Sequence, residues 1–294
     1  METQMTFKRY ELKYILSRKQ KRRLLEEMEA YMKLDGYGRS TIRNLYYDTP
    51  QFRLVRRSNE KPVYKEKLRV RSYQRAGAED KVFVELKKKY EDVVYKRRIA
   101  LPQKTALDWL AGGRPLLEKS GEYSGKHRIT EGEQRHLRII DPWKGGTSAG
   151  CTWTDRQITK EIEYFCRFYQ TLSPAVFLAY EREAYYALDG SDFRVTFDEA
   201  ICYRQKELTL DSAVYGMPLL KPDETLMEIK TSRAIPLWMV RFLSKEKIYK
   251  TSFSKYGEAY RKILSEAKAS QKMPDPKRIR EVIKDDESII SRAV

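Results

Sequence analysis

The chain has 294 residues, of which 59 are Lys or Arg and 42 are Asp or Glu, so its formal net charge is +17. A chain of this length can bury a substantial core, and because 41% of its residues are hydrophobic it is not expected to be disordered as a whole. It has no apolar run of about 18 residues, the minimum for a spanning helix, and its start, METQMTFKRY, lacks the apolar stretch of a signal peptide, so membrane spans and secretion are disfavoured.

The cysteines indicate the cellular compartment, and the net charge indicates the class of ligand. Cys151, Cys166 and Cys202 are odd in number and widely spaced, without a CxxC pair, which predicts reduced thiols in a cytoplasmic protein and disfavours a disulfide framework or a zinc site. A charge of +17 must attract something anionic: nucleic acid, an anionic lipid surface, or a phosphorylated molecule or polymer.

The first predicted elements are a strand and a helix. Residues 9–14 alternate charged with apolar or aromatic side chains, as a β-strand with one ionic and one apolar face does. Ser17 followed by Gln20 forms a capping-box pattern, so a helix is expected to begin there. Thr49 before Pro50 predicts the start of a short second helix that runs to about Arg57.

Two strongly charged strands follow. Residues 65–71 carry a basic side chain at every other position, while Leu68 and Val70 point the opposite way. Residues 82–87 place Glu85 and Lys87 on one face and apolar side chains on the other. Residues 111–156 contain two Gly-Gly pairs and many polar residues, which indicates loops and a variable insertion.

The second half repeats these patterns. Helices are expected over residues 159–169, from Pro236 onward, and over 256–267, where apolar residues recur at helical spacing. Residues 193–198 and 226–230 are two more strands with one ionic and one apolar face. The expected organisation is one domain over residues 1–268 and a charged tail or peripheral helix over 269–294.

The ionic faces raise two alternatives. One charged face is usually the solvated side of an antiparallel sheet. These faces, however, are rich in Arg and Lys and come from segments between residues 9 and 230. A sheet that closed with those faces inward would concentrate like charges in one lumen, which requires a polyanion or internal carboxylates to neutralise them. Helices would then cover the apolar outer faces.

Absent motifs exclude other chemistry. Neither GxxxxGK[ST] nor GxGxxG occurs, so a conventional nucleotide-binding α/β fold is unsupported. His127 and His136 are the only histidines and lie in the loop-rich middle, which disfavours a histidine-based triad or metal site. Nucleic acid is also disfavoured, because Tyr10, Phe193 and Phe197 lie opposite the basic side chains and could not stack bases beside them.

An ordered set of segments resembles the VTC domain, the catalytic domain of polyphosphate polymerases of the vacuolar transporter chaperone type, within the triphosphate tunnel metalloenzyme (CYTH-like) superfamily. These segments span about residues 7–260 and are Arg9-x-Glu11-x-Lys13-Tyr14, Asn44-Leu45-Tyr46-Tyr47-Asp48-Thr49, Lys67-x-Arg69-x-Arg71, Glu85-x-Lys87, Tyr180-Glu181-Arg182-Glu183-Ala184-Tyr185, residues 193–198 and Glu228-x-Lys230. The resemblance implies an α+β fold: a closed antiparallel β-barrel tunnel of about eight strands with a basic lumen, clad by helices.

The resemblance also implies an activity and a site. It implies a transferase that moves the γ-phosphate of ATP to a growing inorganic polyphosphate chain, with a divalent metal, Mn²⁺ or Mg²⁺, held by Glu228. The implied catalytic residues are Arg69, Arg71, Arg182, Arg194 and Glu228. The implied phosphate-binding residues are Lys13, Lys67, Lys87, Lys230, Lys250, Ser252, Ser254 and Lys255.

One departure bears on the reaction. Hydrolytic relatives carry Glu-x-Glu-x-Lys near the start, whereas this chain has Arg9-x-Glu11-x-Lys13. Fewer inward acids favour the polymerase over a metal-dependent triphosphatase, which remains an alternative. A non-catalytic polyphosphate or inositol-phosphate binding protein is the other. Eukaryotic members attach to membrane-embedded modules, so the resemblance implies that any membrane link here comes from a separate partner chain.

Overall fold

A computed structural model describes residues 10–91, 93–112, 117–118, 138–139 and 153–272. The strands are β1 (Tyr10–Ser17), β2 (Met32–Leu34), β3 (Ser40–Asp48), β4 (Tyr64–Ser72), β5 (Lys81–Tyr90), β6 (Val93–Pro102), β7 (Leu117–Glu118), β8 (Arg138–Ile139), β9 (Ser173–Ala187), β10 (Arg194–Arg204), β11 (Met217–Pro218), β12 (Glu224–Thr231) and β13 (Lys250–Thr251). The helices are α1 (Arg18–Met28), α2 (Arg53–Asn59), α3 (Gln103–Leu110), α4 (Trp153–Tyr169), α5 (Leu237–Lys245) and α6 (Lys255–Lys272).

One antiparallel sheet of eleven strands organises the described part of the chain. Its main path runs β13-β1-β12-β10-β9-β3-β4-β5-β6, with β2 added to β9 and β11 added to β10, while β7 and β8 form a separate pair. The prediction of a closed barrel of about eight strands is wrong on both counts. The sheet has more strands, and no pairing among the described residues joins β6 to β13. The sheet nevertheless curls far enough that β1 and β6 line the same cavity.

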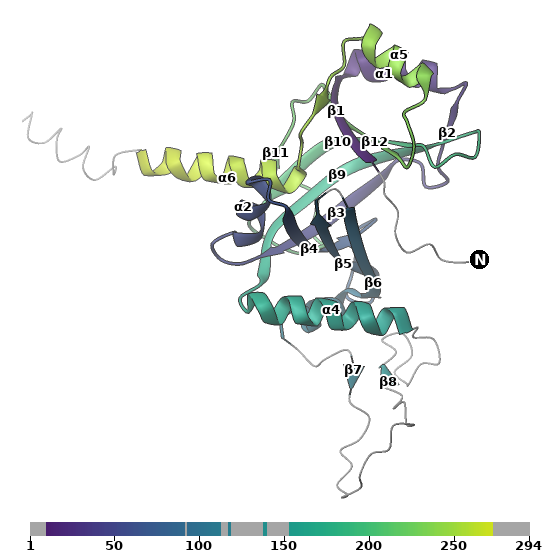
Figure 1. The fold of residues 1–294 in the computed structure, drawn as a ribbon. Coiled ribbons are helices and arrows are strands. Elements are labelled where there is room, and N and C mark those ends of the chain that lie inside the picture. Colours follow the sequence, from purple (N-terminus) through teal and green to yellow (C-terminus); the bar gives the residue numbers. More distant parts are fainter. Residues whose placement is uncertain (1–9, 92, 113–116, 119–137, 140–152, 273–294) are drawn as a thin grey trace, which may run out of the picture.

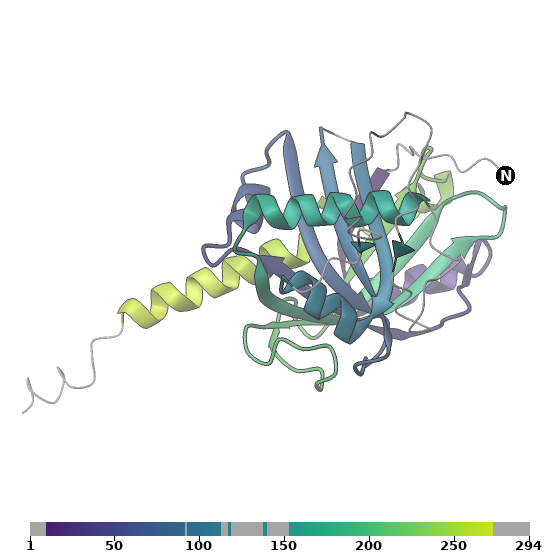
Figure 2. The same ribbon diagram turned by 90° about the horizontal axis from the view of Figure 1, so that it is seen from below.

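Helices cover the outer face of the sheet in three groups, as predicted. In Figure 1, α1 and α5 lie together at one end and α2 and α6 lie side by side, while Figure 2 shows α4 running across the strands. Each group has its own apolar cluster. Ile162 of α4 packs in the cluster that contains Leu68, Met239 of α5 in the one that contains Phe197, and Tyr256 of α6 in the third. The ionic faces are thereby left to point inward.

Several helix boundaries follow from local hydrogen bonds. Ser17 caps α1 with the predicted capping box, because its side chain accepts from the Gln20 amide and the Gln20 side chain accepts from the Ser17 amide. The helix predicted from Pro50 begins instead at Arg53, since Phe52 has φ of 56° and interrupts the helical path.

Helices α4 and α6 are longer than predicted. Helix α4 starts at Trp153 instead of residue 159, and α6 extends to Lys272, past the expected boundary at 268. Most of residues 111–156 and the tail beyond 272, including Cys151, His127 and His136, lie outside the described residues. Cys166 and Cys202 are free thiols. None of the helices described has both the length and the apolar character needed to cross a membrane.

Candidate functional site

A cavity of about 440 Å³ lies on the inner face of the curled sheet. It is lined by nine basic side chains and three carboxylates, together with tyrosines, Val94 and Ser254. The basic residues are Lys13, Lys67, Arg69, Arg71, Lys87, Lys96, Arg182, Lys230 and Lys255, and the acids are Glu11, Glu85 and Glu228. They come from β1, β4, β5, β6, β9, β12 and the start of α6, so the fold brings distant ionic segments together.

Strand alternation accounts for this composition. In β4, Lys67, Arg69 and Arg71 face the cavity, while Leu68 and Val70 between them are 0% exposed in the outer core. The same period of two places cavity residues in β1, β5 and β12, where the sequence predicted ionic faces.

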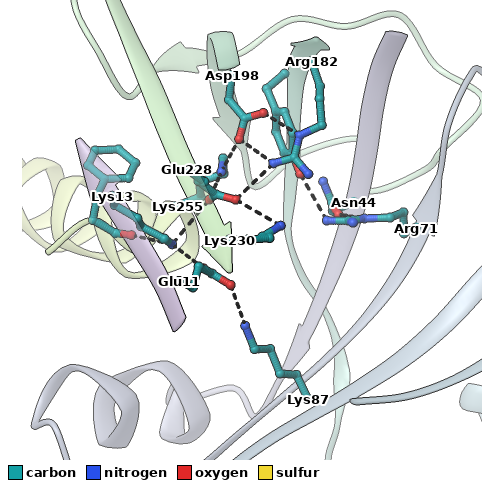
Figure 3. Close-up of polar contacts among 12 residues, drawn as sticks. Glu11, Lys13, Asn44, Arg71, Lys87, Arg182, Asp198, Glu228, Lys230 and Lys255 are labelled. Atoms are coloured by element: carbon teal, nitrogen blue, oxygen red, sulfur yellow. Dashed lines mark hydrogen bonds and ion pairs between the residues drawn. The ribbon is translucent and has the colours of Figure 1, made fainter. Parts of the chain in front are cut away.

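Glu228 is surrounded by cations (Figure 3). Its carboxylate lies 2.9 Å from Lys255 Nζ, 3.4 Å from Lys13 Nζ and 3.3 Å from Arg182 Nη2. Lys230 Nζ is 3.6 Å away. Burial by itself raises the pKa of this carboxyl, but the charges of Lys255 and Lys13 outweigh burial and hold the pKa well below its usual range. Glu228 is therefore an anion that orders four cations.

Asp198 fixes two of those cations, Arg182 and Lys255. Arg182 Nε and Nη2 donate to its two carboxylate oxygens at 2.6 and 2.7 Å, a bidentate pair, and Lys255 Nζ lies 2.5 Å from the same carboxylate. Asp198 is 0% exposed. Because both guanidinium and ammonium are held by two acids each, Arg182 and Lys255 form a preorganised pair at the cavity wall.

Arg69 and Arg71 are also held in place. Arg69 donates to Glu85 at 2.8 Å and to the Tyr46 hydroxyl at 3.0 Å. Arg71 donates to Asn44 Oδ1 at 2.8 Å and to the Tyr180 hydroxyl at 3.1 Å.

Glu85 is the carboxylate that several cations in this part of the cavity share. Lys96 Nζ lies 2.8 Å and Arg98 Nε 3.2 Å from its carboxylate. Burial raises its pKa, but Arg69 and Arg71 reverse that effect and lower it. Glu85 is thus charged and neutralises only part of the positive charge around it.

Lys67 differs from these cations. Its Nζ donates to Ser254 Oγ at 2.9 Å, and the same oxygen accepts from the Gly257 amide in the first turn of α6. Burial, followed by the charges of Lys13 and Lys87, lowers the pKa of Lys67 to about 7. Its ammonium is consequently poised to gain or lose a proton near neutral pH.

The structure brings ten of the thirteen sequence-predicted site residues to the cavity. These are Lys13, Lys67, Arg69, Arg71, Lys87, Arg182, Glu228, Lys230, Ser254 and Lys255. Their catalytic and binding roles stay predictions. The geometry accounts for where they point, because each belongs to an inward face of a strand or to the start of α6.

Arg194, Lys250 and Ser252 are placed elsewhere, which corrects the expectation that they project into the cavity. Arg194 is at the end of β10, where Asp35 pairs with it at 3.0 Å, and its side chain is 47% exposed. Lys250 lies opposite Tyr14 in the sheet register, and both Lys250 and Ser252 are exposed.

Several residues of the site had no predicted role. Glu11, Glu85 and Asp198 carried a signal, because they share the alternation that identified the basic residues. For Tyr46 and Lys96 the signal in the sequence was weaker. Strand β3 is buried on both faces and β6 carries charges on both faces, so neither strand shows a clean period of two.

The donor set fits a divalent cation only in part. No group of three or more His, Cys, Asp or Glu side chains that could hold a metal occurs within the described ranges. Mg²⁺ in phosphate sites is bound by one or two carboxylates together with phosphate oxygens. Glu228, which lies in the cavity with Glu11 nearby, fits a cation of that kind, whose remaining ligands come from phosphate and water.

Comparison with known proteins gives one extensive match. The family model described as the VTC domain matches residues 8–264. None of the curated proteins matches the chain.

Solved structures give weaker similarities. A Vibrio parahaemolyticus protein described as a candidate adenylate cyclase is 13% identical over 89% of this chain and 99% of its own, with a TM-score of 0.42. A Bacillus halodurans protein with the same description is 13% identical over 83% and 92%, with a TM-score of 0.43. A Hippeastrum protein described as having a dominant triphosphatase activity is 16% identical over 84% and 92%, with a TM-score of 0.42.

Proposed function

The chain belongs to the VTC domain family, and from that membership we propose that it is a polyphosphate polymerase. In this proposal it transfers the γ-phosphate of ATP to the end of a growing inorganic polyphosphate chain within the cavity. The observation that supports the proposal best is the excess of nine basic side chains over three carboxylates around one cavity. Such an excess is self-repelling unless a multiply charged anion occupies the space.

The arrangement of the cations suits a triphosphate. Arg69, Arg71 and Arg182 are each oriented by a hydrogen bond to an acid, an amide or a phenol, so their remaining N–H groups are available to phosphate oxygens. Guanidinium groups fixed in this way stabilise charge on the transferred group without reorganising during the reaction.

The transfer needs no protein nucleophile. A terminal oxygen of the acceptor chain attacks the γ-phosphorus, the bond from that phosphorus to the β–γ bridging oxygen breaks, and ADP leaves with that oxygen. Catalysis of this kind depends on positioning and on neutralising the equatorial oxygens. Lys13 and Lys87, on the β1 and β5 sides of the cavity, are placed to align the acceptor phosphate.

A divalent cation, Mn²⁺ or Mg²⁺, would be held by Glu228, with Glu11 as a second carboxylate. When bound it would supply additional neutralisation of phosphate charge. Lys255 and Lys230, whose ammonium groups lie beside Glu228, would orient the Glu228 carboxylate toward the phosphates.

The alternative of a triphosphatase receives less support from the site. Hydrolysis requires a group that orients and activates water, yet each of the three cavity carboxylates is already paired with at least two cations. Their low proton affinity makes them poor bases.

Product analysis tests the proposal. The protein is incubated with ATP and Mn²⁺, and in parallel with Mg²⁺, and ADP, orthophosphate and polymer are quantified. We expect long polymer, with one phosphate incorporated for each ADP released. Orthophosphate without polymer would identify a triphosphatase, and tight polyphosphate binding without turnover under either metal would identify a receptor.

A matched pair of variants ties the activity to the cavity. Arg182→Ala removes a cavity guanidinium and should lower turnover by about 100-fold or more. Arg97→Ala is the control, because Arg97 pairs with Glu161 of α4 at 3.0 Å on the outer face and should leave turnover unchanged.

A further inference from the structure

Arg43 of β3 points away from the cavity, to the outer face of the sheet. Its neighbour Asn44 faces inward and holds Arg71 (Figure 3). Arg43 therefore shares its face with Leu45, a member of the apolar cluster that contains Leu68. Arg43 is 9% exposed, and its Nε has no hydrogen-bond partner in the part of the chain that the structure describes. Buried polar groups are nearly always hydrogen-bonded, so this guanidinium lacks an acceptor that the described protein does not supply.

A second arginine, Arg204 of β10, lies on the same outer face. In the sheet register Arg43 is opposite Ala179 of β9, and Ala179 is opposite Cys202 of β10. Arg204 follows Cys202 by two residues, and its guanidinium lies 3.6 Å from the centre of the Phe177 ring, which belongs to the same apolar cluster. Two arginines from different strands thus share one part of the outer face.

A third arginine, Arg75, is tied to this place by the loop over residues 205–216. Its Nε donates to the Asp211 carbonyl of that loop. Arg204 donates to the Tyr215 carbonyl of the same loop at 3.1 Å. These carbonyls fix the two side chains without neutralising their charge. Because Arg75 is exposed, the group of three arginines opens to solvent on its side.

The charge of Arg43 is only weakly balanced by acids. Burial, and after it the charge of Arg75, lowers the pKa of Arg43, while the charge of Glu181 acts in the opposite direction. Glu181 is already engaged, because the Thr41 hydroxyl donates to it at 2.7 Å and Arg39 Nε lies 3.8 Å from it. The arginines therefore leave an excess of positive charge on this part of the outer face.

We propose that Arg43 and Arg75, with the fixed charge of Arg204 beside them, bind a small phosphate-type dianion on the outer face of the sheet. A tetrahedral dianion offers oxygens to two guanidinium groups at once, whereas a carboxylate has two oxygens and a single charge. The anion would supply the acceptor that Arg43 Nε lacks. This site is separate from the cavity, whose arginines point to the other face, and it does not depend on the proposed function.

Thermal unfolding tests the site, with inorganic phosphate and methyl phosphate as probes and sodium chloride at equal ionic strength as the reference. The dependence of the unfolding temperature on probe concentration gives the affinity. Arg75→Met, at an exposed position, should weaken phosphate binding to this site by about tenfold, and Arg43→Met by about 100-fold. The control is Arg22→Met, which removes the same charge from an exposed position of α1 and should bind both probes as the unaltered protein does.

Two further measurements distinguish a binding site from a structural role and from the cavity. Without phosphate, Arg43→Met should unfold at the same temperature as the unaltered protein or a higher one, because it replaces a buried donor that lacks an acceptor with an apolar side chain. Calorimetric titration with tripolyphosphate should show less than a threefold change in cavity affinity for Arg43→Met and Arg75→Met.

The outcomes decide the inference without deciding the proposed function. Stabilisation by both probes identifies the phosphoryl group as the feature recognised, and stabilisation by inorganic phosphate alone identifies the free ion. Equal phosphate effects in Arg43→Met, Arg75→Met and the control overturn the site. So does a parallel loss of tripolyphosphate affinity, which would place the effect in the cavity, or a lower unfolding temperature of Arg43→Met without phosphate, which would make Arg43 structural.

Discussion

At the scale of single residues, two arginines in adjacent strands show what decides membership of the site. Arg182 and Arg194 each pair with an aspartate, but Arg182 is buried with Asp198 at the cavity wall, whereas Arg194 pairs with Asp35 at the end of β10. We expect Arg182→Ala to weaken tripolyphosphate binding by about 100-fold, because it removes a desolvated guanidinium and leaves Asp198 partly unpaired. Arg194→Ala should change it by less than about threefold.

Titration calorimetry on the two variants checks this prediction, with circular dichroism to confirm that both are folded. Equal losses of tripolyphosphate affinity in the two variants would show that Arg194 contacts the ligand and leaves Asp35 when the ligand binds.

Lys67 gives a prediction for pH. Its pKa is lowered from 10.5 to about 7, so in the folded protein it is charged below pH 7 and loses its proton as the pH rises through that value. Between pH 7 and 10.5 the unfolded chain holds this proton and the folded chain does not, so this group makes the unliganded protein more stable as the pH rises through that window.

Ligand binding has the opposite pH dependence. A phosphate chain favours the charged form of Lys67, so tripolyphosphate affinity should fall between pH 6 and pH 8, with proton uptake on binding at the higher pH. Lys67→Arg stays charged throughout, and tripolyphosphate itself gains negative charge over this range, so the affinity of this variant should not fall. The measurement is calorimetry in two buffers of different ionisation enthalpy, and identical pH profiles for the two proteins would contradict the assignment.

Most of the cavity residues could be predicted from sequence because strand alternation and the resemblance both identified them, whereas Arg182, Ser254 and Lys255 were identified by the resemblance alone. The three misplaced ones could not. Arg194 has the right parity in its strand but lies too near the strand end, and Asp35, which holds it, is distant in sequence. Lys250 and Ser252 lie in a short segment where a shift of one residue reverses the face.

At the scale of elements, Asp48 joins two helices to the cavity. It is 0% exposed and accepts hydrogen bonds from the Leu54 and Val55 amides of α2 at 2.8 and 3.0 Å. It also accepts from the Tyr256 hydroxyl of α6 at 2.9 Å. Since Tyr256 follows Lys255 and Ser254, this carboxylate positions the part of α6 that contacts the site.

We expect Asp48→Ala to lower the free energy of unfolding by about 3 kcal/mol, because it leaves several buried donors without an acceptor. Glu60→Ala, at the exposed end of α2, is the control and should change it by less than about 0.5 kcal/mol. Urea unfolding measures both values. A change for Asp48→Ala as small as that of the control would show that water replaces the carboxylate and that α6 does not depend on it.

Elements were predictable to different extents for a physical reason. Strands β1, β4, β5, β10 and β12 have one apolar and one ionic face, which a period of two reveals. The start of α2 was predictable only in part. Thr49 Oγ1 accepts from the Arg53 amide, but the Leu54 and Val55 amides are capped by Asp48, and the turn between places Phe52 in the left-handed region.

At the scale of the whole molecule, the curl of the sheet is what brings charged side chains from six strands into one site. Sequence alternation shows that such faces exist, but it does not show whether the last strand pairs with the first. In the described residues β6 and β13 remain unpaired with each other, and contact across the cavity is made instead by side chains, such as Lys87 and Glu11 at 3.6 Å (Figure 3).

The uncompensated charge predicts a strong effect of anions on stability. Tripolyphosphate at 100 times its dissociation constant should stabilise the protein by about 2.7 kcal/mol, whereas sodium chloride of equal ionic strength only screens the cavity. Thermal unfolding with each additive provides the measurement, and Arg182→Ala should lose most of the tripolyphosphate effect. Equal stabilisation by both salts would indicate general screening and no specific site.

The position of tripolyphosphate in crystals of the protein tests the central claim most directly, because that claim is geometric. We predict density for the phosphates within hydrogen-bond distance of Arg69, Arg182 and Lys255, in the cavity lined by residues of β1, β4, β9 and α6. Tripolyphosphate bound only on the outer surface, with the cavity filled by water, would contradict the account.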